Sequence, residues 1–533
     1  MKHLADSFSR MSPEEFLRFV LLAIAALMLS NLIFSAMSYE FGYEYVGFLS
    51  GPPGPVDRFA DIVKTSLSYK TLTSGIQNTE EFWSWPDLYK AYFLYNPYGG
   101  KEALALGGFS HFHHPPFYTL VYLAFAALIV KTRSVPFALY VFAGLYLAVV
   151  LWTIFIGIPK ARRTKTVLIT LCSLALLSYP ALLVFAKANC AGFTSLLIVA
   201  FLLSVFGRRH AGLAALASLA IAVNFRPNAG IFVFALPIAL GLKQSIKPIL
   251  IFVALAAAIF GGSYFLVHTL YPDYTLGTFL QGLGAFDRFY IVGSDGDGGN
   301  SSLFAFVKNF NTVAMALGHQ RLLFLLLTAA LLVAAAWGLR HPSAWFVTLP
   351  FAALCLYCMV VVFTDYHGYF LPVFFAFGTA FVGFAGWGLW RSPDRARAAP
   401  FLLCALYCLL TPVFADYHLL VFLAPPLLAA LNSREGDGYP PLMAAVGIGS
   451  VLVLAPKNYV FIRYPSYFPS TGYSCISLQT IFNPLVLYLI AFYVAGEAAR
   501  LFRSSASEAE FSAPELTMKI TRQALPTGAG GSG

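Results

Sequence analysis

Apolar runs that match the thickness of a lipid bilayer recur along almost the whole chain, and they limit the possible folds more than any other feature. A helix needs about 20 apolar residues to cross a hydrocarbon layer of about 30 Å. Of 533 residues, 59% are hydrophobic and only 11% are charged, whereas a soluble domain has about 25% charged residues. Most of this sequence must therefore face lipid or other buried helices, which excludes a soluble globular domain.

The apolar runs are predicted to be helices, because inside a bilayer the backbone polar groups must be satisfied within the protein. The polar and apolar alternation of a transmembrane barrel, in segments of about ten residues, is not found in the sequence. The first run, Phe19–Phe34, lacks a cleavage site and is expected to be an anchor. We therefore predict an all-α, polytopic membrane protein with about 12–15 spans.

The net charge of +10 is distributed in short basic clusters between the apolar runs. Such clusters set the orientation of membrane proteins, so we expect them on the cytoplasmic side and expect no nucleic acid as partner. They are Lys131–Arg133, Lys160–Lys165, Arg208–Arg209, Lys243–Lys247, Arg391–Arg397 and Arg500–Arg503. Segments rich in aromatic residues, Asp, Gly and Pro alternate with them and are expected on the other side: 38–113, 185–192, 224–228, 270–312, 364–369, 414–418 and 456–480.

This alternation fails once, at residues 114–130 and 136–158. Two full spans there would put Lys131 and Lys160 on opposite faces. Either one basic loop lies outside, or one neighbouring stretch is only a half-span. Further along, the short stretches 211–223 and 228–242 are candidates for broken helices.

The expected organisation is one membrane domain with two long outer loops, the first of which contains interfacial helices. Its parts are a cytoplasmic N-terminus at 1–18, the transmembrane domain at 19–500, outer loops at 38–113 and 270–312, and a cytoplasmic tail at 501–533. Within the tail, Thr527–Gly533 has the composition of an added linker and is set aside.

Asp57 and Asp61 are four residues apart in the first loop, so a helix there carries both on one face. Two carboxylates at the mouth of a membrane domain suggest a general base acting on a hydroxyl. The alternative is a helix cap and a solvated surface charge. Three histidines close the same loop, at 111, 113 and 114. They suit either a divalent cation or an interfacial belt before the Pro115-Pro116 helix start.

Arg226, in Asn224-Phe-Arg-Pro-Asn228, is expected at the outer end of a broken span. A membrane-buried arginine is costly and binds phosphate or carboxylate in a fork, unless it snorkels to the interface.

In the second loop, Asn300 and Ser302 follow an Asp/Gly-rich stretch that suits an anionic or sugar group, and they also match a glycosylation acceptor. Asp-Tyr-His occurs twice, at 365–367 and 416–418, at the outer ends of apolar runs; chance repetition is the alternative to a site.

Several of these pieces together resemble the GT-C class of membrane glycosyltransferases, and within it glycosyltransferase family 87, which includes polyprenyl-phosphomannose-dependent mannosyltransferases. The matching pieces lie in order over about residues 20–430. They are Asp57-Arg-Phe-Ala-Asp61 with Asn96-Pro-Tyr98, His114-Pro-Pro116, Pro180 with Ala188-Asn189, Arg226-Pro227, Asn300-Ser-Ser302-Leu303, and Asp416-Tyr-His418 before Pro425-Pro426. The family usually has Asp-Phe or Asp-Leu where this chain has Asp57-Arg-Phe, so either Asp57 or Asp61 can hold the catalytic place.

The resemblance implies that a sugar is transferred from a polyprenyl-phosphate donor to a lipid-linked or glycan acceptor. The site would face the periplasm or exterior of a bacterial inner membrane. It implies Asp57, Asp61 and His418 as catalytic residues, and Arg226, Tyr417 and His418 as ligands of the donor phosphate. It further implies substrate-binding residues at His113, His114, Asn189, Asn300, Ser302 and Asp416. No cofactor is expected, and a divalent metal is left open.

Two other functions are compatible with parts of the sequence. Broken helices and intramembrane charges also occur in secondary transporters, which place ionisable residues at the bilayer midplane. An O-antigen ligase or polymerase shares the lipid substrate and an outer active site, but has its large loop late in the chain.

Overall fold

The computed structural model describes the helical part of the chain. The described residues are 11–40, 114–132, 134–208, 210–272, 274–286, 395–411, 414, 416–433, 441–455, 461–465 and 473–477, with single positions at 302, between 325 and 356, and between 483 and 494. Over this part the predicted α-helical architecture is confirmed, with one short hairpin as the exception.

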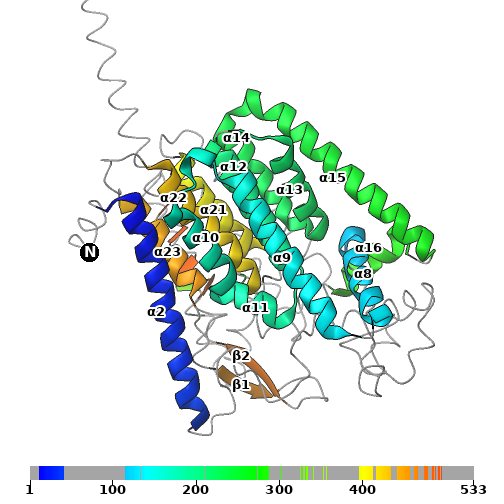
Figure 1. Ribbon diagram of the computed structural model, residues 1–533, viewed down its shortest axis with the longest axis horizontal. Helices are drawn as coiled ribbons and strands as arrows, with labels where there is room; N and C mark the ends of the chain where they lie inside the picture. The colour runs from blue at the N-terminus through cyan, green and yellow to red at the C-terminus, as the bar shows by residue number, and fades with distance from the viewer. Residues whose placement is uncertain are drawn as a thin grey trace, which may run out of the picture.

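The elements follow one another in this order (Figure 1). The helices before the break at Arg226 are α2 (Pro13–Glu40), α8 (Pro116–Thr132), α9 (Val135–Gly157), η3 (Lys160–Arg162), α10 (Lys165–Leu177), α11 (Tyr179–Lys187), α12 (Ala191–Arg208) and α13 (Leu213–Phe225). After it come η4 (Pro227–Phe234), α14 (Ala235–Leu240), α15 (Leu242–Leu270), α16 (Leu276–Phe286), α21 (Arg395–Leu410), η8 (Asp416–Leu423), α22 (Ala424–Asn432) and α23 (Pro441–Leu454), then strands β1 (Phe461–Pro465) and β2 (Tyr473–Ser477).

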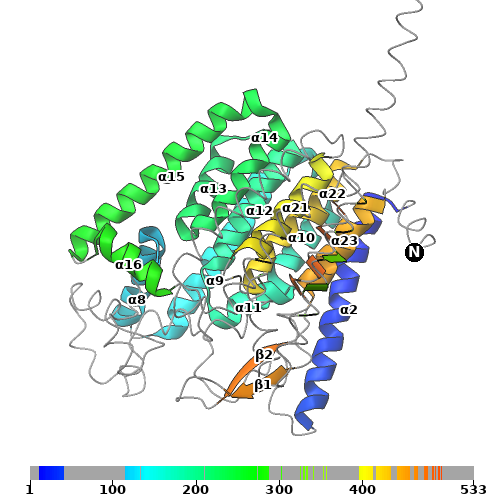
Figure 2. The ribbon, with the colours of Figure 1, turned by 180° about the vertical axis from the view of Figure 1, so that it is seen from behind.

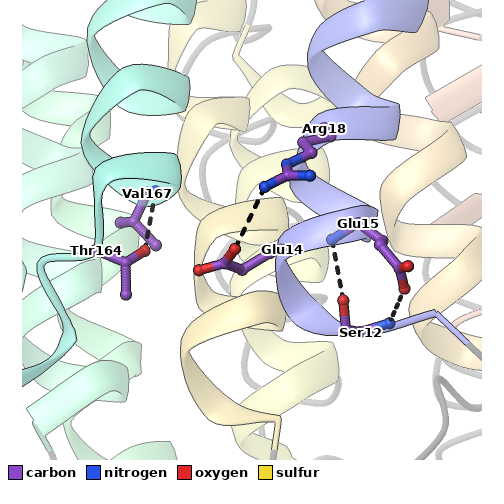
Figure 3. A network of polar contacts seen from close by, with 6 residues as sticks. All are labelled: Ser12, Glu14, Glu15, Arg18, Thr164 and Val167. Atoms are coloured by element: carbon purple, nitrogen blue, oxygen red, sulfur yellow. Dashed lines mark hydrogen bonds and ion pairs between the residues drawn. The ribbon is translucent and has the colours of Figure 1, made fainter.

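Side-chain caps fix the starts of several helices. At α2, the Ser12 hydroxyl accepts from the Glu15 N–H (3.3 Å) while the Glu15 carboxylate accepts from the Ser12 N–H (2.7 Å), a reciprocal capping box. These hydrogen bonds hold the pKa of Glu15 below its usual value. The Thr164 hydroxyl caps α10 in the same way, by accepting from the Val167 N–H (3.3 Å). Figure 3 shows both caps, so α2 and α10 begin at the same end of the bundle.

Helix α12 is the centre of the bundle. It packs against α9, α13, α22 and η8, and 89% of its most apolar window is buried, against 22% for α9 and 11% for α15. A helix that is apolar on all sides belongs in such a core. Figures 1 and 2 show α2 and α15 on opposite sides of this core.

Three helices in the described part are long and apolar enough to cross a membrane: Pro136–Gly157, Ala191–Arg208 and Leu242–Leu270. Lys165–Leu177 and Tyr179–Phe185 make a fourth if they form one span bent by 50°. The other apolar helices in the described part are shorter, with 10–17 residues. The predicted number of spans concerns the whole chain and stays a prediction.

One end of the bundle gathers positive charge. Helices α9 and α12 run parallel, because Phe142 stacks near Phe193 (5.0 Å between ring centroids) at one end and Arg208 reaches Ile158 at the other. The Arg208 Nη2 donates to the carbonyls of Phe155 (2.9 Å) and Ile158 (2.8 Å), and Arg163 donates to the same two carbonyls. Cations suit the negative C-terminal end of a helix. We call this the basic end.

Helix α8 does not cross from one end of the bundle to the other. Just before it, the His114 carbonyl accepts from the hydroxyl of Tyr274, which follows α15. At its other end, the Thr132 hydroxyl is 3.5 Å from the carbonyl of Ser134, which caps the start of α9. Both neighbours lie at the end opposite the basic end. Lys131 therefore lies away from the basic end. Both sequence alternatives, a basic loop outside and a half-span, fit this arrangement, and the half-span stays a prediction.

Apart from the cluster at Lys131, which was expected on the cytoplasmic side, the alternation of basic and polar segments holds along the described helices. The polar segments near 189, 226, 274 and 414 meet at the end opposite the basic end, which we call the site end.

The exception to the all-α prediction, the antiparallel β1–β2 hairpin, pairs Phe461 with Ser477 and Pro465 with Tyr473. Both views place it at the site end (Figures 1 and 2).

Candidate functional site

Arg226 lies at the turn between α13 and η4, at the site end. Helix α13 stops at Phe225, and Arg226 is extended (φ −144°, ψ 107°), because the residue before a proline is disfavoured in helical conformation. Its N–H still closes the last turn onto the Ala222 carbonyl (2.8 Å). From Pro227 the chain turns back as η4 and α14 toward the basic end. The predicted break at this position is confirmed.

The Arg226 side chain is only partly exposed. Within the described part of the chain the one ion pair is Arg18–Glu14 (3.6 Å), so no described carboxylate neutralises Arg226. Helix α13, which ends just before Arg226, has 13 residues against 18 in α12, so it is about 7 Å shorter at 1.5 Å per residue. A partly buried cation without a described acidic partner is a natural anion site.

Two hydrogen bonds attach this break to the end of α21. The Asn228 Nδ2 donates to the Thr411 hydroxyl (2.9 Å), although the two residues are 183 positions apart. The Thr411 hydroxyl in turn donates to the Tyr407 carbonyl (2.6 Å). Arg226 is close enough to the Tyr407 phenol to interact with it electrostatically. The position of Arg226 relative to α21 is therefore set by side-chain bonds and not only by helix packing.

His418 lies beside the same α21 end, in η8. Its side chain is fully buried, and its ring packs against Phe414 (5.1 Å between centroids) and Tyr417 (4.4 Å). Phe414 also contacts Tyr407 (5.3 Å). The structure thus groups His418 and Tyr417 with Arg226 through Tyr407. Asp416 begins η8, and its side chain is outside the described residues.

His114 reaches the same region through aromatic contacts. Its ring stacks on Tyr118 (4.4 Å), and Tyr118 contacts Phe225 (6.2 Å), the residue before Arg226. The Tyr274 hydroxyl donates to the His114 carbonyl (3.0 Å). His114, which follows the first loop, is therefore held beside the end of α13 through Tyr118.

Asn189 has a structural role that the sequence reasoning did not include. Its Oδ1 accepts from the Ala191 N–H (2.7 Å), which caps the start of α12. The preceding Ala188 has a left-handed backbone (φ 51°, ψ 48°), which is strained for a residue with a Cβ. The next N–H, of Cys190, donates to the Tyr122 hydroxyl (3.4 Å). Its assignment as a substrate ligand stays a prediction.

The remaining predicted site residues are Asp57, Asp61, His113 and Asn300, which lie outside the described residues, and Ser302, which is fully buried. No group of three or more His, Cys, Asp or Glu side chains suited to a metal ion occurs in the described part of the chain.

Two residues near Arg226 were missed by sequence reasoning. Tyr407 and Thr411 belong to an apolar run in which one tyrosine looks like any other core aromatic. Only the threonine before Pro412 signals a polar helix end, and nothing local connects it to Asn228.

Comparison with protein-family models, with curated proteins and with solved structures gave no match.

Proposed function

We propose that this chain is a membrane glycosyltransferase that transfers a sugar from a polyprenyl-phosphate donor to a lipid-linked or glycan acceptor. The observation that carries the proposal is Arg226, a partly buried cation without a described acidic partner, which lies between α13 and η4. The fork of its guanidinium fits a phosphate. The resemblance of the site segments to glycosyltransferase family 87 supports the same donor class.

In the proposed reaction, the acceptor hydroxyl attacks the anomeric carbon while a carboxylate takes its proton. The new glycosidic C–O bond forms as the bond from the anomeric carbon to the phosphate oxygen breaks. The polyprenyl phosphate leaves with the electron pair of that bond. Arg226 stabilises the charge that develops on this leaving group, as preorganised donors do in other enzymes. His418 lies near enough to the same cluster to assist.

The donor is tested with purified protein in nanodiscs supplied with polyprenyl-phosphate sugars and a lipid-linked acceptor mixture. We expect one sugar donor to be consumed, with release of polyprenyl phosphate measured by mass spectrometry. Omitting the acceptor mixture is the control, since transfer needs both substrates. Lack of turnover with every donor, with substrate uptake into proteoliposomes instead, would favour the secondary transporter, to which the interrupted hairpin at Arg226 also points.

We also propose that the site end faces the exterior. The basic end then follows the usual cytoplasmic bias of Lys and Arg. Lys131 and Lys160 offer a matched pair for a test, because both are exposed and they flank α9 at its two ends. With the seven native cysteines replaced, we expect Lys131→Cys, and not Lys160→Cys, to react with an impermeant thiol reagent in intact cells. The reverse pattern would invert the proposed orientation.

A further inference from the structure

The phenol of Tyr407 is a buried hydrogen-bond donor, and no described residue accepts its proton. Only 1% of the residue is exposed, and its hydroxyl has no hydrogen-bond partner among the described residues. Buried hydroxyls are nearly always satisfied, because leaving one unpaired forfeits its hydration without replacement. A phenylalanine would fill the same space between Phe232 (5.1 Å between centroids) and Phe414 (5.3 Å) without this cost.

The position of this phenol is fixed from two sides. The two rings hold its plane, and the Asn228–Thr411–Tyr407 hydrogen bonds attach its backbone to the residue two positions after Arg226. Arg226 and the Tyr407 phenol interact electrostatically. The guanidinium can only donate, so it cannot accept the proton of the phenol.

An acceptor with negative charge would satisfy both groups at once. We propose that the Tyr407 hydroxyl donates a hydrogen bond to the phosphate that Arg226 binds, so that Tyr407 is a second phosphate-binding residue. This inference rests on the proposed function, and it adds a residue to the donor-phosphate site. The phenol keeps its proton throughout: it hydrogen-bonds the phosphate of the bound donor and the polyprenyl phosphate that leaves.

The chemistry recognised is a phosphate oxygen, which a lipid phosphate and a free phosphate share. The experiment compares Tyr407→Phe with wild type by thermal shift in detergent, using three probes: undecaprenyl phosphate, undecaprenol and inorganic phosphate. Undecaprenol carries the same chain without the charge. Tyr146→Phe is the matched control, because the Tyr146 hydroxyl is equally buried but already donates to the Ala175 carbonyl (2.7 Å) within the bundle.

We expect undecaprenyl phosphate, and not undecaprenol, to stabilise wild type, with an affinity about 10–100-fold lower in Tyr407→Phe, as expected for a hydrogen bond to a charged group. Without ligand, Tyr407→Phe is expected to melt no lower than wild type, since it loses no bond. Tyr146→Phe is expected to melt lower and to bind the phosphate normally.

The remaining outcomes separate this inference from the proposed function. Wild-type affinity in Tyr407→Phe, with binding lost in Arg226→Ala, would overturn the role of Tyr407 and leave the lipid-phosphate donor standing. Stabilisation by inorganic phosphate alone, lost in Tyr407→Phe, would support the anion site and overturn the polyprenyl donor. Binding of neither phosphate, or equal stabilisation by undecaprenol, would overturn the inference.

Discussion

Arg226→Ala is expected to lower the kcat/KM for the polyprenyl-phosphate donor by about 10²–10³-fold, the effect of removing one preorganised donor from a developing negative charge. The charge of the leaving phosphate appears beside a partly buried cation, where less water competes for it than at an exposed surface. The backbone of Arg226 closes the last turn of α13, and its side chain makes no described hydrogen bond or ion pair. The variant is therefore expected to fold, and the loss to be one of function.

Arg226→Lys is expected to recover part of this loss, because the charge is kept but the planar fork that engages two phosphate oxygens is not. Arg162→Ala is the control for a general change in net charge, since Arg162 is exposed and lies at the basic end. Steady-state rates with a fixed acceptor give the comparison. A folded Arg226→Ala protein with full activity would show that the phosphate binds elsewhere.

The break at Arg226 could be predicted because its cause is local. Proline at 227 disfavours a helical conformation of the residue before it. A basic segment flanks the far end of each of the two apolar stretches that meet at Arg226, so both far ends are expected on the cytoplasmic side. The grouping of segments at two ends of the bundle follows from the same rule. Charge and proline therefore predicted where the site segments meet, without any knowledge of side-chain contacts.

The composition of the site beyond Arg226 could not be predicted, because it depends on pairings between distant helices. The Asn228–Thr411 bond joins positions 183 residues apart, and Tyr407 has the same apolar sequence surroundings as a core residue. The sequence left two arrangements open near α8, because two full spans at 114–130 and 136–158 put Lys131 and Lys160 on opposite faces. The cap that Asn189 provides for α12 was also not predicted, and its role as a substrate ligand stays a prediction.

The second large effect concerns the base that accepts the proton of the acceptor hydroxyl. A hydroxyl attacking near neutral pH needs a carboxylate or a histidine within reach. His418 is fully buried between Phe414 and Tyr417. The first loop supplies Asp57 and Asp61, and the resemblance to family 87 assigns the catalytic place to one of them. Asp57 opens a predicted interfacial helix, whose N-terminal end favours the ionised carboxylate.

Asp57→Asn is expected to lower turnover by about 10²–10⁴-fold, the range for loss of a general base, while leaving donor binding nearly unchanged. Asparagine keeps the shape of the side chain and removes its basicity, so a folding defect is not expected. Turnover is measured with saturating donor, and donor affinity by the shift that undecaprenyl phosphate produces in melting temperature. Arg226→Ala provides the opposite pattern, in which donor binding is lost together with turnover.

Asp61→Asn decides between the two carboxylates, because Asp61 lies one helical turn further along the same predicted face. Normal turnover in Asp57→Asn, with Asp61→Asn inactive, would move the base to Asp61 and keep the mechanism. Near-normal turnover in both single variants and in the double variant would remove the carboxylate mechanism. In that case His418→Gln becomes the informative change, since glutamine retains hydrogen bonding without accepting a proton near neutral pH. A loss in that variant alone would place the base at His418, beside Tyr417.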